Sequence, residues 1–278
     1  IPMFISQKYH EDFGYYHLPY ALSFIEEKIV FGFANIDKPF VYNSIWLNLY
    51  PIFFYENKNF DFLTLPSFIL YLTFIFFSLG QIISKSKILT SDYYLVVVLF
   101  YLILKFTRIS EFGVDLPSAI FSILGIYYFI KFFETILENE KKKYFFLIVI
   151  FSIFSILIKL STLPIILLSL YIYLKDFKKL KFSLIDLKFF FIFLLFSSYL
   201  IQQFIYSGCF FYPTNLTCFN VNWFNTEFLD LSKELELVNK SYFVEAKEIY
   251  SPEQYLSQFN WFYFWIKRNF IEISEHFL

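Results

Sequence analysis

The densest group of chemically capable side chains lies between His10 and His17. Glu11 and Asp12 are adjacent carboxylates, and two of the three histidines in the chain flank them. A carboxylate can act as a general base where burial or a neighbouring charge tunes its pKa. The same groups could hold a divalent metal, although adjacent Glu and Asp are not a recognised metal-binding spacing. The alternative is a hydrated polar loop.

A second group of ionisable residues occupies the string TRISEFGVDLPSAI, which contains Arg108, Glu111 and Asp115. Ionisable residues close to a membrane usually line a cavity or find a partner. Arg108 could bind a phosphate, or it could pair with Glu111. Asp115, followed by Pro117, also fits an ordinary helix start. Lys159 is a further cation, for which snorkelling to the membrane surface is the simpler explanation.

Other chemical signatures are weak or absent from the sequence. It contains no P-loop, no glycine-rich dinucleotide fingerprint, no metal-binding CxxC pair and no GxSxG elbow. A net charge of −1 gives no bulk attraction for nucleic acid. Cys209 and Cys218 could form a disulfide if their segment faces an oxidising compartment, and two free thiols fit equally well.

The composition requires lipid as the solvent for much of the chain. The 278 residues are 58% hydrophobic and 17% charged, whereas about a quarter of a soluble domain is charged. Apolar runs of roughly 20 residues indicate transmembrane helices. The sequence predicts six of them, at 62–84, 92–107, 115–136, 144–159, 162–174 and 186–206. The fourth and fifth are short and could form a tight hairpin, a re-entrant pair or one broken helix.

Lysines gather in the connections that follow the first, third and fifth predicted helices. They are Lys85 and Lys87; Lys141, Lys142 and Lys143; and Lys175, Lys178, Lys179, Lys181 and Lys188. Short cytoplasmic loops are enriched in Lys and Arg. We therefore expect these connections on the cytoplasmic side and residues 1–61 and 207–260 on the opposite face.

These two outer segments flank the predicted transmembrane core, 62–206. In the first, Leu18, Leu22, Ile25 and Val30 share one face of a predicted amphipathic helix that lies on the bilayer surface. The second segment, 207–278, ends with the aromatic and basic string FNWFYFWIKRNF, which is typical of a membrane interface. A further membrane-associated helix is expected beyond it, which makes the sequence a fragment of a longer chain.

The layout and four short strings resemble a branch of bacterial multi-pass membrane proteins related to GT-C type glycosyltransferases. The strings are EDFGYYHLPYALSFIEEKIVFGFANI, NSIW, SEFGVDLPSAI and SGCFFYPTNLTCF. The resemblance implies an all-α, polytopic transmembrane bundle with interfacial helices in the first outer loop. It implies Asp12 or Glu11 as the catalytic base, and Glu111 or Asp115 as an acidic residue of the second loop. Arg108 would contact the phosphate of a polyprenyl-phosphate sugar donor.

The expected function is therefore sugar transfer from this lipid-linked donor to a cell-envelope acceptor, at the outer face of a bacterial plasma membrane. The residues expected to bind the substrates are His10, His17, Arg108, Glu111, Asp115 and Lys159. The expected partners are the bilayer and the lipid-linked donor, without nucleic acid. The alternatives are a transporter or flippase, an envelope polysaccharide polymerase, and a scaffold without catalysis. Spans nearly devoid of interior charge favour surface chemistry over a conduction path.

Overall fold

The computed structural model describes residues 13–26, 29–36, 40, 43–54, 63–84, 88–104, 112–180, 187–212, 215–257 and 259–277. Side chains are described for these residues except at 26, 54, 177–180, 187–188, 228–233 and 271–277. Within this part of the chain, the regular structure is helical apart from one antiparallel bridge between Cys209 and Cys218. The prediction of an all-α fold is confirmed.

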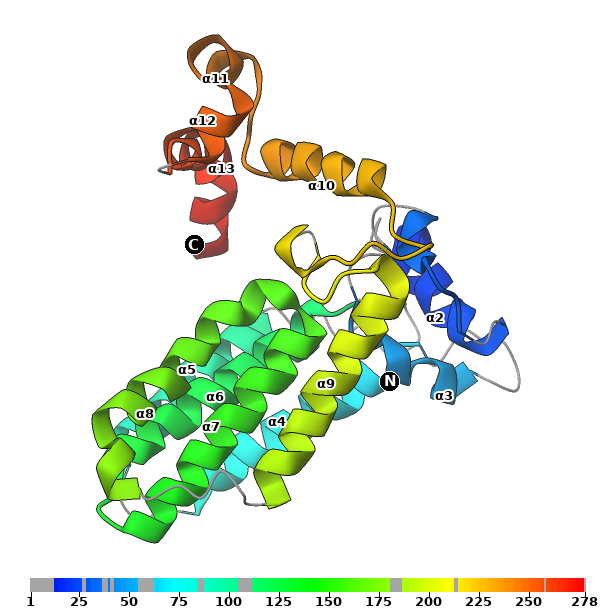
Figure 1. Cartoon of the computed structure of the whole chain (residues 1–278). Coiled ribbons are helices and arrows are strands. Elements are labelled where there is room, and N and C mark those ends of the chain that lie inside the picture. The colour runs from blue at the N-terminus through cyan, green and yellow to red at the C-terminus, as the bar shows by residue number, and fades with distance from the viewer. Residues whose placement is uncertain are drawn as a thin grey trace. The chain divides into compact units, whose positions relative to one another are not determined.

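The helices follow one another along the chain in the order shown by the labels of Figure 1. They are α2 (Leu18–Glu26), α3 (Pro51–Phe54), α4 (Leu65–Ile83), α5 (Thr90–Leu104), α6 (Asp115–Glu134), α7 (Glu138–Ile158), α8 (Ile166–Leu180), α9 (Leu187–Ser207), α10 (Thr226–Asn239), α11 (Val244–Ile249), α12 (Pro252–Leu256) and α13 (Trp261–Phe277). A short π-helix forms η1 (Phe13–His17). Short 3-10 helices form η2 (Phe33–Asn35), η4 (Leu47–Leu49), η7 (Leu160–Ile165) and η8 (Asn215–Thr217).

Among the described residues, three helices are long and apolar enough to cross a membrane, namely Leu65–Ile83, Asp115–Glu134 and Phe189–Ser207. The helix α5 is apolar but has only 15 residues. The first turns of α7 carry the charged string ENEKKK, and α8 has only 15 residues. The chain is therefore a helical membrane protein, and α4 to α9 occupy the positions of the six predicted spans.

The fourth and fifth predicted spans are separate helices. The six-residue η7 joins α7 to α8, and the two helices pack against each other, as Figure 1 shows. Pro164 lies inside η7 and lacks the N–H that an α-helix would need at this position. Of the three alternatives, one broken helix is not what forms, and the hairpin and the re-entrant pair both fit two packed helices.

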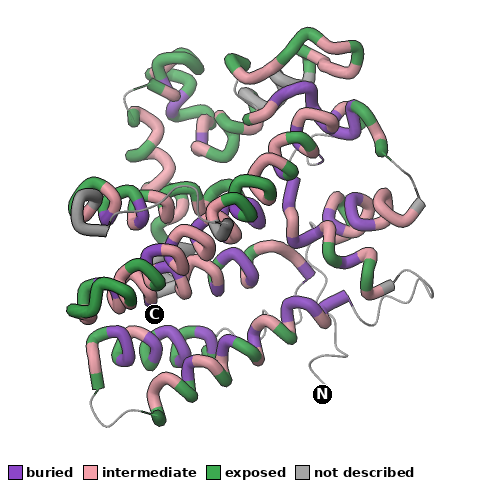
Figure 2. The backbone as a smooth tube through the Cα atoms, turned by 60° about the horizontal axis from the view of Figure 1, so that its bottom comes forward, coloured by how far each residue is buried: buried purple, intermediate pink, exposed green. Residues whose placement is uncertain are grey.

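The described residues fall into two compact units. Unit 1 comprises Ile1–Val30 and Tyr42–Gln202, and unit 2 comprises Phe31–Val41 and Gln203–Leu278. Buried and exposed positions alternate along the helices of unit 1 (Figure 2). Large apolar side chains occupy many of the exposed positions, including Val97 at 66% and Phe193 at 64% exposure. Such faces are stable where lipid rather than water surrounds them.

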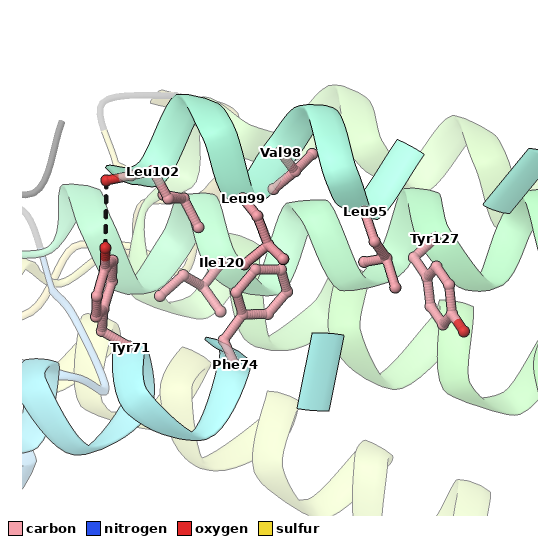
Figure 3. Close-up of a cluster of buried hydrophobic side chains, with 8 residues drawn as sticks. All are labelled: Tyr71, Phe74, Leu95, Val98, Leu99, Leu102, Ile120 and Tyr127. Carbon is pink, nitrogen blue, oxygen red and sulfur yellow. Dashed lines mark hydrogen bonds between the residues drawn. The ribbon is translucent and has the colours of Figure 1, made fainter. Parts of the chain in front are cut away.

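Two apolar clusters hold the helices of unit 1 together. The first joins α4, α5 and α6 (Figure 3) through Tyr71, Phe74, Leu95, Val98, Leu99, Leu102, Ile120 and Tyr127. The hydroxyl of Tyr71 donates to the carbonyl of Leu102 at 3.3 Å, which satisfies a polar group within this apolar surrounding. The second cluster joins α6, α7 and α8 through Phe132, Phe145, Ile148 and Ile172.

The most extensive helix pair is α6 with α7, and small residues lie where the two helices meet. We call Ser118, Ser122 and Gly125 of α6, with Ser152 and Ser155 of α7, the α6–α7 seam. A Cβ added to Gly125 would lie 3.6 Å from Ser152 Oγ and 3.4 Å from Ile165 Cδ1. Small residues allow membrane helices to approach closely and gain van der Waals contact.

The N-terminal amphipathic helix differs from its prediction. The helix α2 ends at Glu26, and Val30 lies outside it. His17, Tyr20 and Ala21 are the buried positions, whereas Leu18, Leu22 and Ile25 are only half-buried. The apolar residues that the sequence pattern highlighted are thus not the ones that pack most deeply against the rest of unit 1. The buried face of α2 depends on which elements pack against the helix. The sequence pattern of the helix alone does not specify those elements.

The larger segment of unit 2 starts at Gln203, in the last turns of α9, and contains a disulfide bond. Cys209 and Cys218 form a disulfide, and the backbone amide of Phe219 donates to the carbonyl of Gly208 at 3.0 Å. Gly208 has a φ of 77°, and a Cβ there would lie 2.9 Å from Phe224 Cβ, so only glycine fits this turn. Of the two states the sequence left open for the cysteines, the disulfide is the one formed.

Candidate functional site

An ion pair joins two elements that are far apart in the sequence. Lys159 Nζ lies 2.5 Å from Asp115 Oδ1, and the two side chains are 40% and 57% exposed, respectively. Asp115 is the first residue of α6, and Lys159 directly follows α7. A carboxylate at a helix N-terminus and a cation at a helix C-terminus are both favoured by the helix dipoles. Lys159 is therefore paired with a carboxylate, and its snorkelling to the membrane surface stays a prediction.

Hydroxyl groups beneath this ion pair hold Lys159 in position. Ser155 Oγ lies 2.7 Å from Ser122 Oγ, 3.0 Å from the carbonyl of Ser118 and 2.9 Å from Thr162 Oγ1. Thr162 Oγ1 in turn donates to the carbonyl of Lys159 at 2.8 Å. These bonds connect the end of α7 to the first turns of α6. The position of the Lys159 backbone is thereby fixed relative to Asp115.

His17 is buried against the loop that leads into Asp115. A Cβ on Gly113 would lie 3.4 Å from His17 Cε1, so the missing side chain lets the imidazole stand close to this backbone. The ring of His17 also lies 6.0 Å from Phe112 and 4.2 Å from Tyr16, measured between centroids. Three of the predicted substrate-binding residues, from η1, α6 and the end of α7, are thus gathered around one loop.

Tyr50 is a polar residue of this region that the sequence did not single out. Its hydroxyl accepts from Trp46 Nε1 at 3.1 Å and lies 3.4 Å from Ser67 Oγ. Its ring is 4.0 Å from that of Phe112. Burial raises the pKa of Tyr50 to about 12, so the hydroxyl stays protonated at neutral pH. The sequence signal was only the string NSIWLNLY, in which nothing marks this tyrosine as the buried one.

A buried set of amides and hydroxyls fastens the N-terminal segment to α9. Tyr20 donates to Asn43 Oδ1 at 2.7 Å, and Gln202 Nε2 donates to the Tyr20 hydroxyl at 3.2 Å. Asn48 Nδ2 donates to Gln202 Oε1 at 3.0 Å, and the Tyr199 hydroxyl donates to the carbonyl of Asn43 at 3.4 Å. These side chains form the amide network. It positions α2, and hence His17 at its start, against the membrane-spanning part of unit 1.

The remaining predicted site residues lie outside the described residues. They are His10, Glu11, Asp12, Arg108 and Glu111. Among the described residues, no three His, Cys, Asp or Glu side chains are placed to share a metal ion. The roles of these five residues stay predictions, as does a divalent metal bound by the first loop.

The fold and the site define a helical membrane protein with a charged and hydroxyl-rich cluster at the ends of two packed helices, α6 and α7. Residues 3–277 match the family described as "Domain of unknown function (DUF8201)", and the chain belongs to that family. Neither the curated proteins nor the solved structures include a match to the chain. The family match covers both units.

Because the amide network stabilises the fold, removing one of its hydroxyls should lower the free energy of unfolding. Tyr20→Phe deletes the hydroxyl that bonds both Asn43 and Gln202, so the Oδ1 of buried Asn43 loses its 2.7 Å hydrogen bond. We expect the free energy of unfolding to fall by about 1–3 kcal/mol, seen as a lower melting temperature in detergent. The matched control is Tyr93→Phe, because the Tyr93 side chain is 63% exposed; a shift within about 0.5 kcal/mol is expected. Equal melting of both variants would contradict a structural role for the network.

Proposed function

We propose that the protein is an integral-membrane glycosyltransferase that moves a sugar from a polyprenyl-phosphate donor to a hydroxyl of a cell-envelope acceptor. The observation that carries the proposal is the Asp115–Lys159 ion pair, with His17 packed against the loop that leads to it. A cation fixed at the ends of membrane helices suits a donor whose charged phosphate sits at the membrane surface while its apolar tail stays in lipid.

In this reaction the acceptor hydroxyl loses its proton to a carboxylate as its oxygen bonds to the anomeric carbon. The bond between that carbon and the phosphate oxygen breaks, and the polyprenyl phosphate leaves with the electron pair. Asp12 is the proposed base, with Glu11 as the alternative. Fixed positive charge near the leaving phosphate stabilises the negative charge that develops on it.

Lys159 is the proposed source of that charge, and Asp115 is its positioning residue. An ammonium group has three N–H donors, of which one meets Asp115 Oδ1. The other two can meet phosphate oxygens, because the Lys159 side chain is 40% exposed. Arg108 is the proposed second phosphate ligand, and His10, His17 and Glu111 complete the proposed donor site.

The charge distribution along the spans favours surface chemistry over transport. In the three membrane-spanning helices, Asp, Glu, Lys and Arg occur only as Asp115, Lys131 and Glu134. All three lie in the first or last turns of α6. A transporter would be expected to place polar or broken helix segments near the middle of the bilayer.

The disulfide supports the proposed placement of residues 207–260 on the outer face of a bacterial plasma membrane. Disulfides persist in oxidising compartments such as the periplasm and are rare in the cytosol. The Cys209–Cys218 bond links residues nine positions apart directly after α9. The lysine-rich connections favour the same orientation, since they would face the cytoplasm.

The proposal predicts which substitutions stop sugar transfer. Asp12→Asn should lower the rate by about 10²–10⁴-fold as a lost general base, and Lys159→Gln by about 10²–10³-fold as a lost electrostatic contact. The measurement is the release of polyprenyl phosphate from synthetic polyprenyl-phosphate hexoses by reconstituted protein, with an envelope fraction as acceptor.

The matched control is Lys240→Gln, which removes a lysine whose ammonium also lies 2.5 Å from a carboxylate, that of Glu236 in α10. Its activity should equal that of the wild type, and all variants should melt at similar temperatures. Full activity in Asp12→Asn, in Glu11→Gln and in the double variant would refute the catalytic assignment.

The proposed orientation predicts how the cysteines react in spheroplasts. Cys209 and Cys218 should take up a membrane-impermeant maleimide only after treatment with an impermeant reductant. A cysteine at Lys142, an exposed residue of α7, should react only after the membrane is permeabilised. Reaction of the native cysteines without reductant would contradict the disulfide, and reaction solely after permeabilisation would reverse the assigned sidedness.

A further inference from the structure

A pocket in unit 2 lies between α11 and α13. Its volume is about 340 Å³, and its lining consists of Ser241, Phe243, Val244, Glu245, Ala246, Phe264, Lys267 and Arg268. Small-molecule sites start at roughly 300 Å³ and combine apolar walls with a few placed polar groups. This pocket has that character, and it contains none of the residues assigned to sugar transfer.

Two cations stand at the pocket, and each is held in place by a neighbour. The Arg268 guanidinium carbon lies 4.0 Å from the centroid of the Phe243 ring. Stacking on a ring face leaves the N–H donors of a guanidinium directed along its edge, where they can meet an oxyanion. Lys267 Nζ lies 2.8 Å from Glu245 Oε2, which uses one of the three ammonium donors. A bidentate guanidinium beside an ammonium is a typical arrangement for binding phosphate.

One face of α13 adjoins this pocket and is apolar and exposed. Phe262, Tyr263 and Phe270, with Phe259 just before the helix, are 50%, 67%, 62% and 74% exposed, respectively. We call these four residues the aromatic stripe. The spacing of Phe262, Tyr263 and Phe270 places these three on one side of α13, with Lys267 between them and Arg268. Exposed aromatic residues beside basic ones are typical of helices that lie in a membrane interface.

The pocket and the stripe together point to one ligand. A soluble phosphate compound would need the cations but would gain nothing from the aromatic stripe. A phospholipid needs both, because its phosphate carries negative charge and its acyl chains adjoin the interface in which the aromatic rings would lie. Three of the described helices are long and apolar enough to span a bilayer, so phospholipid is a ligand class that fits this protein's surroundings.

We propose that the pocket between α11 and α13 binds the phosphate head group of a membrane phospholipid while the aromatic stripe enters the bilayer interface. This is a lipid site separate from the Asp115–Lys159 cluster. It would hold unit 2 at the membrane surface. Arg268 supplies the bidentate contact, Lys267 the second cation, and Ser241 a hydroxyl at the pocket wall.

The test compares two lipids that differ only in the phosphate. The full chain, delipidated in detergent, is titrated with phosphatidic acid or with diacylglycerol of the same acyl chains, and bound lipid is counted by native mass spectrometry. Phosphatidic acid should bind at least about tenfold more tightly, and Arg268→Gln should weaken its binding by about tenfold or more, as expected for a charged hydrogen bond. Lys247→Gln, an exposed lysine of α11 outside the pocket lining, should leave binding unchanged.

Three results would overturn the proposal. Diacylglycerol could bind as tightly as phosphatidic acid, Arg268→Gln could behave like Lys247→Gln, or millimolar inorganic phosphate could displace the lipid completely. The last result would assign the pocket to a soluble phosphate.

Membrane insertion of the aromatic stripe can be measured separately in the same protein. The two native cysteines are bonded to each other, so a cysteine introduced at Phe262 can be labelled selectively with an environment-sensitive dye. In nanodiscs its emission should shift to the blue and be quenched by brominated lipid. The matched label at Glu253, an exposed residue of α12, should show neither effect. Equal emission and equal quenching of the two labels would contradict the insertion of the aromatic stripe into the membrane.

Discussion

Unit 1 depends on the close approach of α6 and α7 along the α6–α7 seam. Between membrane helices the hydrophobic effect contributes little, because lipid tails are as apolar as leucine side chains, so association rests on van der Waals contact and hydrogen bonds. Small side chains at Ser118, Ser122, Gly125 and Ser152 provide the contact, and Ser155 bonds across to α6 at 2.7 Å through Ser122. A larger residue in the seam would separate the helices and break these bonds together.

The features of the site follow from this seam. With α7 fixed against α6, its last turn presents Lys159 to Asp115. A carbonyl at the end of the same helix, that of the buried Leu157, accepts from the backbone amide of Ile45 at 3.2 Å. That bond and the amide network bring the N-terminal segment to the helix ends, with His17 against Gly113. Hydrogen bonds thus set the positions here that hydrophobic burial would set in a soluble protein.

Sequence alone anticipated those parts of the structure that depend on local pattern. Apolar length located the helices α4 to α9, and the Asp115–Leu–Pro117 string marked the start of α6 correctly. The Asp115–Lys159 pair could not be foreseen, because 44 positions separate the two residues and the pairing exists only once α6 and α7 have packed. Tyr50 was missed for the same reason. Val30 was wrongly included in the amphipathic helix, since periodicity does not show where a helix ends.

The central claim is that the ends of α6 and α7, with the loop before α6, receive the phosphate of a polyprenyl donor. Photo-crosslinking tests it most directly, using a polyprenyl phosphate that carries a diazirine next to the phosphate and the reconstituted full chain. The account predicts crosslinks concentrated in peptides that contain residues 112–118 and 159–162, suppressed by excess unlabelled polyprenyl phosphate. Crosslinks spread along the exposed faces of α4 and α9, and insensitive to that competitor, would contradict it.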